Sequence, residues 1–132
     1  MTQEMALLLL LWQEACLEHE TENDKLLPGA TSATEEEFAT LEGIVKAEQF
    51  PITLSDFNIA YASFKTGADR IKECLKVLSA SAYDFRIKTI RYLVKMASAS
   101  HEDGNKNPIS KAESKFIVFV TQALNVRDED LV

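Results

Sequence analysis

Hydrophobic residues recur at intervals of three and four positions along most of this chain, and few stretches alternate as a β-strand would. This spacing predicts an all-α fold, a helical bundle of about six to seven helices. The first helix should cover about residues 3–19. Because residues 7–12 are apolar on every side of that helix, we expect it to lie at the centre of the bundle, with Leu8, Leu11 and Trp12 in the core.

Helix start signals, in which a Ser or Thr is followed three positions later by an acidic residue, divide the rest of the chain. They predict helices over about residues 34–48, 81–100 and 110–124. Periodicity predicts two further helices between them, one from about residue 55 and one over about residues 68–79 with its own start signal at Thr66, and a short tail helix from about residue 127. The side chains expected to face the core are, in chain order, Phe38, Leu41, Val45, Phe57, Ala60, Tyr61, Phe64, Ile71, Cys74, Leu75, Leu78, Tyr83, Ile87, Ile90, Val94, Ala97, Phe116, Ile117, Val120 and Leu124.

Two segments share the pattern Ala-x-x-x-His-Glu and contain the two histidines of the chain. One runs over residues 15–20 and the other over residues 97–102. Each is followed by an acidic loop and then by a helix with a start signal. This repetition predicts a single domain, residues 1–132, built from two helical hairpins at 3–48 and 82–126 that are related by a pseudo-two-fold axis. The helices within residues 54–79 would then be a connecting pair.

Several motifs in the second copy occur in the same order as in a known family. They are the small residues 97–100, Asp103-Gly104, Pro108-Ile109-Ser110 with Glu113, and Leu124-Asn125-Val126. The chain therefore resembles, over most of its length, the TerB-like (tellurite-resistance) domain family, whose pattern is A-x-A-D-G, a short turn, I-S-x-x-E, an apolar helix and L-G-[IV]. The turn before Ile109 is longer than in that family, and the first copy has Glu20, Glu22 and Asp24 where the family has Asp-Gly. The resemblance implies a compact helical accessory protein of stress or metal-anion resistance systems, with a divalent cation bound through acidic residues and no established enzyme activity.

The two predicted hairpins carry acidic residues at corresponding places, beside the loops that follow their first helices. Clustered carboxylates repel one another unless a cation or a basic side chain neutralises them, and hard cations accept carboxylate oxygens from several segments. We therefore expect a divalent cation site that prefers calcium or magnesium over zinc. Its predicted ligands are Glu20, Glu37, Asp103 and Glu113.

Two alternatives to such a site stay open. Lys106 or Lys111 could neutralise the acids in ion pairs, and Glu37 and Glu113 could simply cap their helices. An EF-hand calcium loop does not fit, because it needs oxygen ligands at positions 1, 3 and 5, glycine at position 6 and glutamate at position 12. Neither counting forward from Asp103 nor counting back from Glu113 gives that pattern.

The net charge of −7 is spread unevenly along the chain. Residues 1–50 contain eleven acidic residues against Lys25 and Lys46, whereas residues 65–95 contain eight basic residues against three acidic ones. The acidic half speaks against nucleic-acid binding and suits a basic partner. Lys88, Arg91 and Lys95 would form an outward basic face that could contact an anionic partner. The acidic and the basic faces could also both be ordinary solvated surface. A protein–protein interaction module without a metal ligand is therefore the alternative function; its partner and its oligomeric state stay open.

The sequence lacks the motifs of common enzyme classes. It has no G-x-S-x-G, no H-E-x-x-H and no G-x-G, and Cys16 and Cys74 fall among apolar helical residues, where buried free thiols are expected. We predict a protein that is not an enzyme. The longest apolar run, residues 5–12, is far shorter than the roughly 20 residues that cross a bilayer, and no signal-peptide pattern precedes it, so we expect a cytoplasmic protein.

Overall fold

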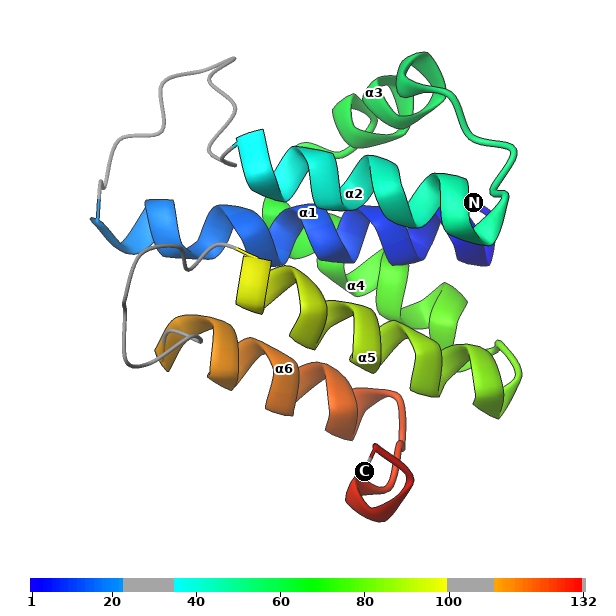
Figure 1. Cartoon of the computed structure of the whole chain (residues 1–132), viewed down its shortest axis with the longest axis vertical. Helices are drawn as coiled ribbons and strands as arrows, with labels where there is room; N and C mark the ends of the chain where they lie inside the picture. The colour runs from blue at the N-terminus through cyan, green and yellow to red at the C-terminus, as the bar shows by residue number, and fades with distance from the viewer. Residues whose placement is uncertain (23–34, 100–110, 132) are drawn as a thin grey trace.

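The computed structural model describes the backbone of residues 1–22, 35–99 and 111–131, and the side chains of 1–16, 38–98 and 111–131. Within these ranges the chain forms six α-helices, one short 3-10 helix and no strand, which confirms the all-α class (Figure 1). The helices are α1 (Gln3–Glu22), α2 (Glu35–Glu48), α3 (Leu54–Ala62), α4 (Gly67–Ser79), α5 (Tyr83–Ala99), α6 (Lys111–Ala123) and the 3-10 helix η1 (Asp128–Leu131). None of the helices in the described ranges is long and apolar enough to span a membrane.

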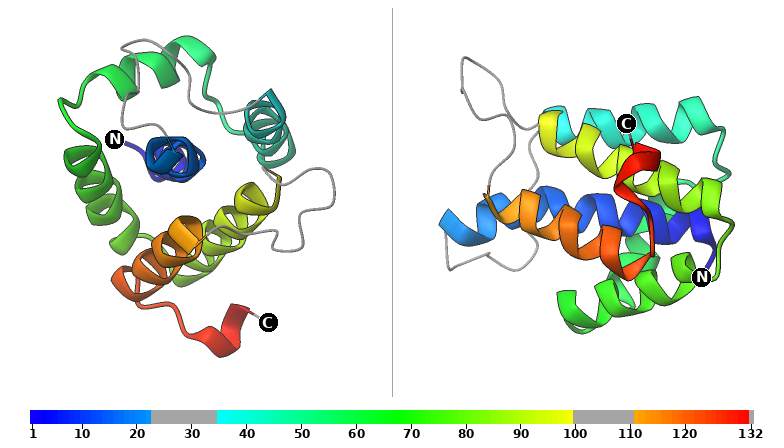
Figure 2. Two further views of the ribbon diagram at one scale, coloured as in Figure 1. Left: turned by 90° about the vertical axis from the view of Figure 1, so that its left-hand side faces the viewer. Right: turned by 90° about the horizontal axis from the view of Figure 1, so that it is seen from below.

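Helix α1 is the centre of the bundle. Figure 2 shows it end-on with the other helices arranged around it, and it packs against all five of the other α-helices. Each residue from Ala6 to Leu11 is at most 1% exposed, so every face of this segment is covered. The predicted central helix is confirmed, and so is the burial of Leu8, Leu11 and Trp12.

The connecting segment does more than join two hairpins. Helix α4 has the most extensive packing against α1 of any helix, and it buries Cys74 and Leu78 completely. It is therefore a wall of the core, and the predicted burial of Cys74 and Leu78 is confirmed. Helix α1 packs against α2, and α5 packs against α6, as two hairpins require. The pseudo-two-fold relation between them stays a prediction.

The starts of the middle helices are set by short polar side chains. The hydroxyl of Thr53 accepts a hydrogen bond from the Asp56 amide at 3.1 Å, and the Asp56 carboxylate accepts one from the Thr53 amide at 3.1 Å. This reciprocal capping box begins α3 one residue before the expected position. Thr66 caps α4 as predicted, because its hydroxyl accepts from the Asp69 amide at 3.1 Å. The start signal at Ser81 is wrong: its hydroxyl donates to the Val77 carbonyl of the preceding helix at 3.3 Å, and α5 begins two residues later.

The buried face of α5 differs from the expected one. Ile90 and Ala97 are buried as predicted, but Leu93 and Met96 are buried too, while Val94 is 41% exposed. Helix α5 contacts α1, α2, α4 and α6, and these four helices cover a broad face of it. Val94 lies on the remaining side, which is exposed. The prediction of Val94 as a core residue is wrong.

The C-terminal tail is fastened to α5 through Tyr83. Its hydroxyl donates to Asp130 at 2.6 Å and accepts from the Arg127 amide at 3.0 Å, while the Arg127 guanidinium lies 2.9 Å from the same carboxylate. The bond from Tyr83 and the adjacent Arg127 lower the pKa of Asp130. The predicted tail helix is present as the 3-10 helix η1.

Glu48 at the end of α2 ties that helix to α5. Its carboxylate accepts hydrogen bonds from the Lys88 ammonium at 2.8 Å and from the Tyr92 hydroxyl at 2.7 Å. Lys88, expected on an outward basic face, is thus bonded to α2. Arg91 is exposed but donates to the Asp130 backbone carbonyl at 3.3 Å, and Lys95 is exposed. The bond from Lys88, followed by the bond from Tyr92, lowers the pKa of Glu48, and burial raises the pKa of Tyr92 to about 12.

This link should make stability depend on pH. Because the pKa of Glu48 is lowered by folding, its stabilisation is complete above the unfolded-state value near 4.5 and is lost as the pH falls through the lower folded-state pKa. Glu48→Gln should therefore reduce the free energy of unfolding by about 0.5–1 kcal/mol at pH 7, and by much less near pH 3. Urea melts at both pH values measure this. The matched control is Glu42→Gln, an exposed residue of the same helix that should change the value at pH 7 by less than about 0.5 kcal/mol. A deficit of Glu48→Gln that is equally large at both pH values would contradict the assignment.

Candidate functional site

One of the four predicted cation ligands has a described side chain. Glu113 lies in the first turn of α6 and is completely buried. It shares the inward face of that helix with Phe116 and Val120, three and seven positions further on. Glu20 belongs to α1 and Glu37 to α2 by backbone, but their side chains lie outside the described residues. Asp103 lies outside them altogether.

A second completely buried glutamate was not expected from the sequence. Glu14 lies in α1 between Gln13 and Ala15 and has no exposed surface. The signal that could have found it is its place in a helix whose neighbouring residues are apolar on every side, because any side chain there is enclosed. An acid in such a helix is unusual, since charged residues are rarely buried unless their charge is compensated.

The two buried glutamates come from helices that pack together. Helix α1 contacts α6, and both Figure 1 and Figure 2 show the first turn of α6 beside the C-terminal half of α1. Glu14 and Glu113 are thus completely buried carboxylates on two helices that pack together.

Because both carboxylates are buried, a negative charge on either of them has to be compensated. Removing a charged carboxylate from water is costly unless protonation, hydrogen-bond donors or a cation compensates the charge. Calcium and magnesium accept carboxylate oxygens, and calcium takes about six to eight oxygen ligands. Within the described ranges no group of three or more Asp, Glu, His or Cys side chains lies close enough together to hold a metal. A complete site would thus need Glu20, Glu37 or Asp103 in addition to the buried pair.

A second buried polar cluster, around Arg70, serves the architecture. Arg70 of α4 donates to the side-chain oxygen of Gln13 in α1 at 2.9 Å and to the backbone carbonyl of Tyr61 in α3 at 3.2 Å. Its guanidinium carbon also lies 3.8 Å from the centre of the Tyr61 ring. Gly67 permits this approach, because a Cβ there would lie only 3.1 Å from the Gln13 amide nitrogen. The Arg70 cluster thus joins three helices.

Both cysteine thiols lie in the interior of the bundle. Cys16 and Cys74 are both buried, and neither forms a disulfide, as predicted. Burial raises the pKa of Cys74 to about 12, so its thiol stays protonated at neutral pH and is a poor nucleophile.

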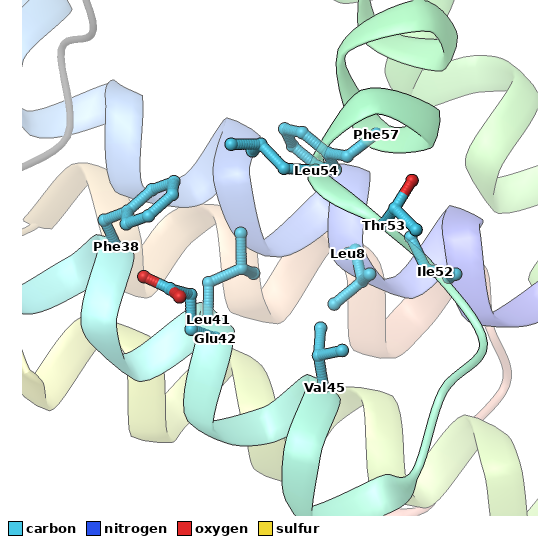
Figure 3. Close-up of a pocket in the computed structure, with 9 residues that line it drawn as sticks. All are labelled: Leu8, Phe38, Leu41, Glu42, Val45, Ile52, Thr53, Leu54 and Phe57. Carbon is cyan, nitrogen blue, oxygen red and sulfur yellow. The ribbon is translucent and has the colours of Figure 1, made fainter.

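An apolar groove runs between α2 and α3, with α1 as its floor (Figure 3). It encloses a cavity of about 150 Å³. Figure 3 shows Leu41 and Val45 of α2 pointing toward Leu8 of α1, with Leu54 and Phe57 of α3 across the gap. The sequence had assigned Val45 to the core, but the side chain is only partly buried and instead lines this groove.

No protein-family model, curated protein or solved structure matches this chain. The resemblance to the TerB-like family therefore stands on the residues quoted above.

Proposed function

We propose that this chain is a non-enzymatic, cytoplasmic accessory protein of the TerB-like kind that binds a divalent cation in a stress or metal-anion resistance setting. The observation that supports this proposal is the burial of two glutamates, Glu14 and Glu113, on two helices that pack together. Glutamate is rarely buried completely unless its charge is compensated, and a bound divalent cation would be one source of that compensation.

The chemistry of the buried pair favours a hard cation. Carboxylate oxygens suit calcium and magnesium, whereas zinc in structural sites is more often held by cysteine and histidine. The pseudo-two-fold relation that we propose between the hairpins would place the region of Glu20 and Glu37 opposite that of Asp103 and Glu113. Acids from both copies could then complete the ligand set around the buried carboxylates.

Cation binding should be visible as a gain in stability. An ion at about 100 times its dissociation constant stabilises the native state by about 2.7 kcal/mol, which for a chain of this size raises the melting temperature by roughly 10 °C. Thermal melts of the parent with a chelator, calcium, magnesium or manganese measure the shift. We expect a rise with calcium or magnesium, and none for Glu14→Gln or Glu113→Gln when each variant is compared with its own chelated sample.

The matched control for the melts is Glu42→Gln, an exposed glutamate that should keep the full ion-dependent shift. If the parent melts at one temperature in all four solutions, the cation proposal is wrong. An interaction module without a metal is then the better description of the chain.

A further inference from the structure

The groove between α2 and α3 exists because these two helices pack on α1 and make little contact with each other. Its walls are apolar apart from Thr53 and Glu42. The cavity of about 150 Å³ is smaller than the roughly 300–1,000 Å³ of a typical small-molecule pocket. That size suits an anchoring side chain of a larger partner better than a complete small ligand.

The rim of the groove exposes apolar surface. Leu54, which lines the groove at the start of α3, is 58% exposed. Phe57 and Phe38 stand on opposite sides and both contact the ring of Trp12 edge-on, at centroid distances of 5.8 Å and 6.2 Å. Covering such surface on binding is favourable, because apolar area is removed from water. Aromatic and aliphatic walls of this kind accept the apolar face of an amphipathic helix.

The charge of the segments that form the groove indicates which kind of helix it would bind. Residues 35–62, which form α2 and α3 and the link between them, contain six acidic residues against the single Lys46. Glu48 is offset by Lys88, but Glu42 lies in the groove itself, and Asp56, two positions after Leu54, is exposed. A partner segment rich in Lys and Arg complements this surface, whereas an acidic one is repelled.

We propose that the groove formed by α1, α2 and α3 binds a basic amphipathic helix of a partner protein, which inserts an apolar side chain into the cavity beside Glu42. This proposal is independent of the cation proposal, because it involves neither Glu14 nor Glu113. It assigns the acidic half of the chain a partner of defined chemistry.

The test uses the complete chain and a pair of synthetic peptides without tryptophan. Each peptide has roughly four helical turns, leucines on one face and either lysines or glutamates on the other. Trp12 is the only tryptophan of the chain, so its emission reports events at the groove, and the anisotropy of labelled peptide measures binding independently. We expect saturable binding of the lysine peptide, with a change in Trp12 emission, and at least tenfold weaker binding of the glutamate peptide.

Two variants of exposed α3 residues separate groove binding from general attraction between opposite charges. Leu54→Gln removes the apolar rim without a change in charge and should weaken binding of the lysine peptide about tenfold. Ile59 is 68% exposed on α3 and does not line the groove, so Ile59→Gln should leave binding within about twofold of the parent.

A third variant, in α2, tests the charge in the groove. Glu42→Lys should weaken binding of the lysine peptide about fivefold or more.

Three results would overturn the proposal. One is equal binding of the lysine peptide by the parent and by Leu54→Gln. Another is equal binding of the two peptides, or none of either up to about millimolar concentration. The third is a parent dimer in sedimentation that Leu54→Gln dissociates, which assigns the groove to a second copy of the chain.

Discussion

Leu11→Ala should lower the free energy of unfolding by about 2–5 kcal/mol, one of the largest effects of any single substitution in this chain. Leu11 has no exposed surface and lies in the middle of α1, which is covered by five helices. Removing its terminal isopropyl group loses the burial of those atoms and leaves a cavity that the surrounding helices cannot fully close. Denaturant melts followed by circular dichroism measure the change.

The matched control is Ile59→Ala, which truncates a similar side chain that is 68% exposed on α3. It should change the free energy of unfolding by less than about 0.5 kcal/mol. If Leu11→Ala costs no more than Ile59→Ala, α1 is not the central helix of the folded protein.

Arg70→Ala should cost about 2–4 kcal/mol, because the guanidinium serves three helices at once. It bonds Gln13 of α1, and it supplies a donor to the Tyr61 carbonyl in the last turn of α3, where helical carbonyls lack partners within their own helix. The substitution leaves these buried acceptors without that donor and removes the contact with the Tyr61 ring. Urea melts give the value directly.

Two further variants define the origin of that loss. Lys72→Ala removes an exposed charge from the same helix and should cost less than about 0.5 kcal/mol. Arg70→Lys should fall between the parent and Arg70→Ala, because an ammonium cannot reproduce the flat, two-armed geometry of the guanidinium. An Arg70→Ala variant as stable as Lys72→Ala would show that the Arg70 cluster contributes nothing to folding.

Periodicity and local start signals were sufficient to predict most helices. The spacing of apolar residues gave the all-α class, and α1 stood out because residues 7–12 are apolar on every side. Thr66 capped α4 as expected, since its hydroxyl acts within its own turn. The start signal at Ser81 failed because α5 begins two residues later, and the Ser81 hydroxyl instead donates to the Val77 carbonyl of the preceding helix.

Features that depend on distant segments were harder to predict. Arg70 is buried because Gln13, 57 residues away, accepts its hydrogen bond, and no local pattern reveals that pair. The exposure of Val94 follows from how α5 lies among four other helices, which the period of its own sequence does not specify.

The candidate cation site was predictable only in part. Glu113 was identified from its motif, and the structure adds that it is buried. Glu14 belongs to no motif, and only its complete burial in the structure made it a candidate ligand. Glu20, Glu37 and Asp103 stay predicted ligands, because their side chains lie outside the described residues.

Calorimetric titration of the complete chain with calcium, magnesium, manganese and zinc tests the proposed function most directly. The proposal predicts saturable heat with calcium or magnesium, weaker binding of zinc, and loss of that heat in the double variant Glu14→Gln with Glu113→Gln. Circular dichroism of the double variant shows whether it keeps the helical fold, so that lost binding is not mistaken for unfolding. The absence of saturable heat from the parent with any of the four ions, or unchanged binding by a folded double variant, would contradict the proposed cation site.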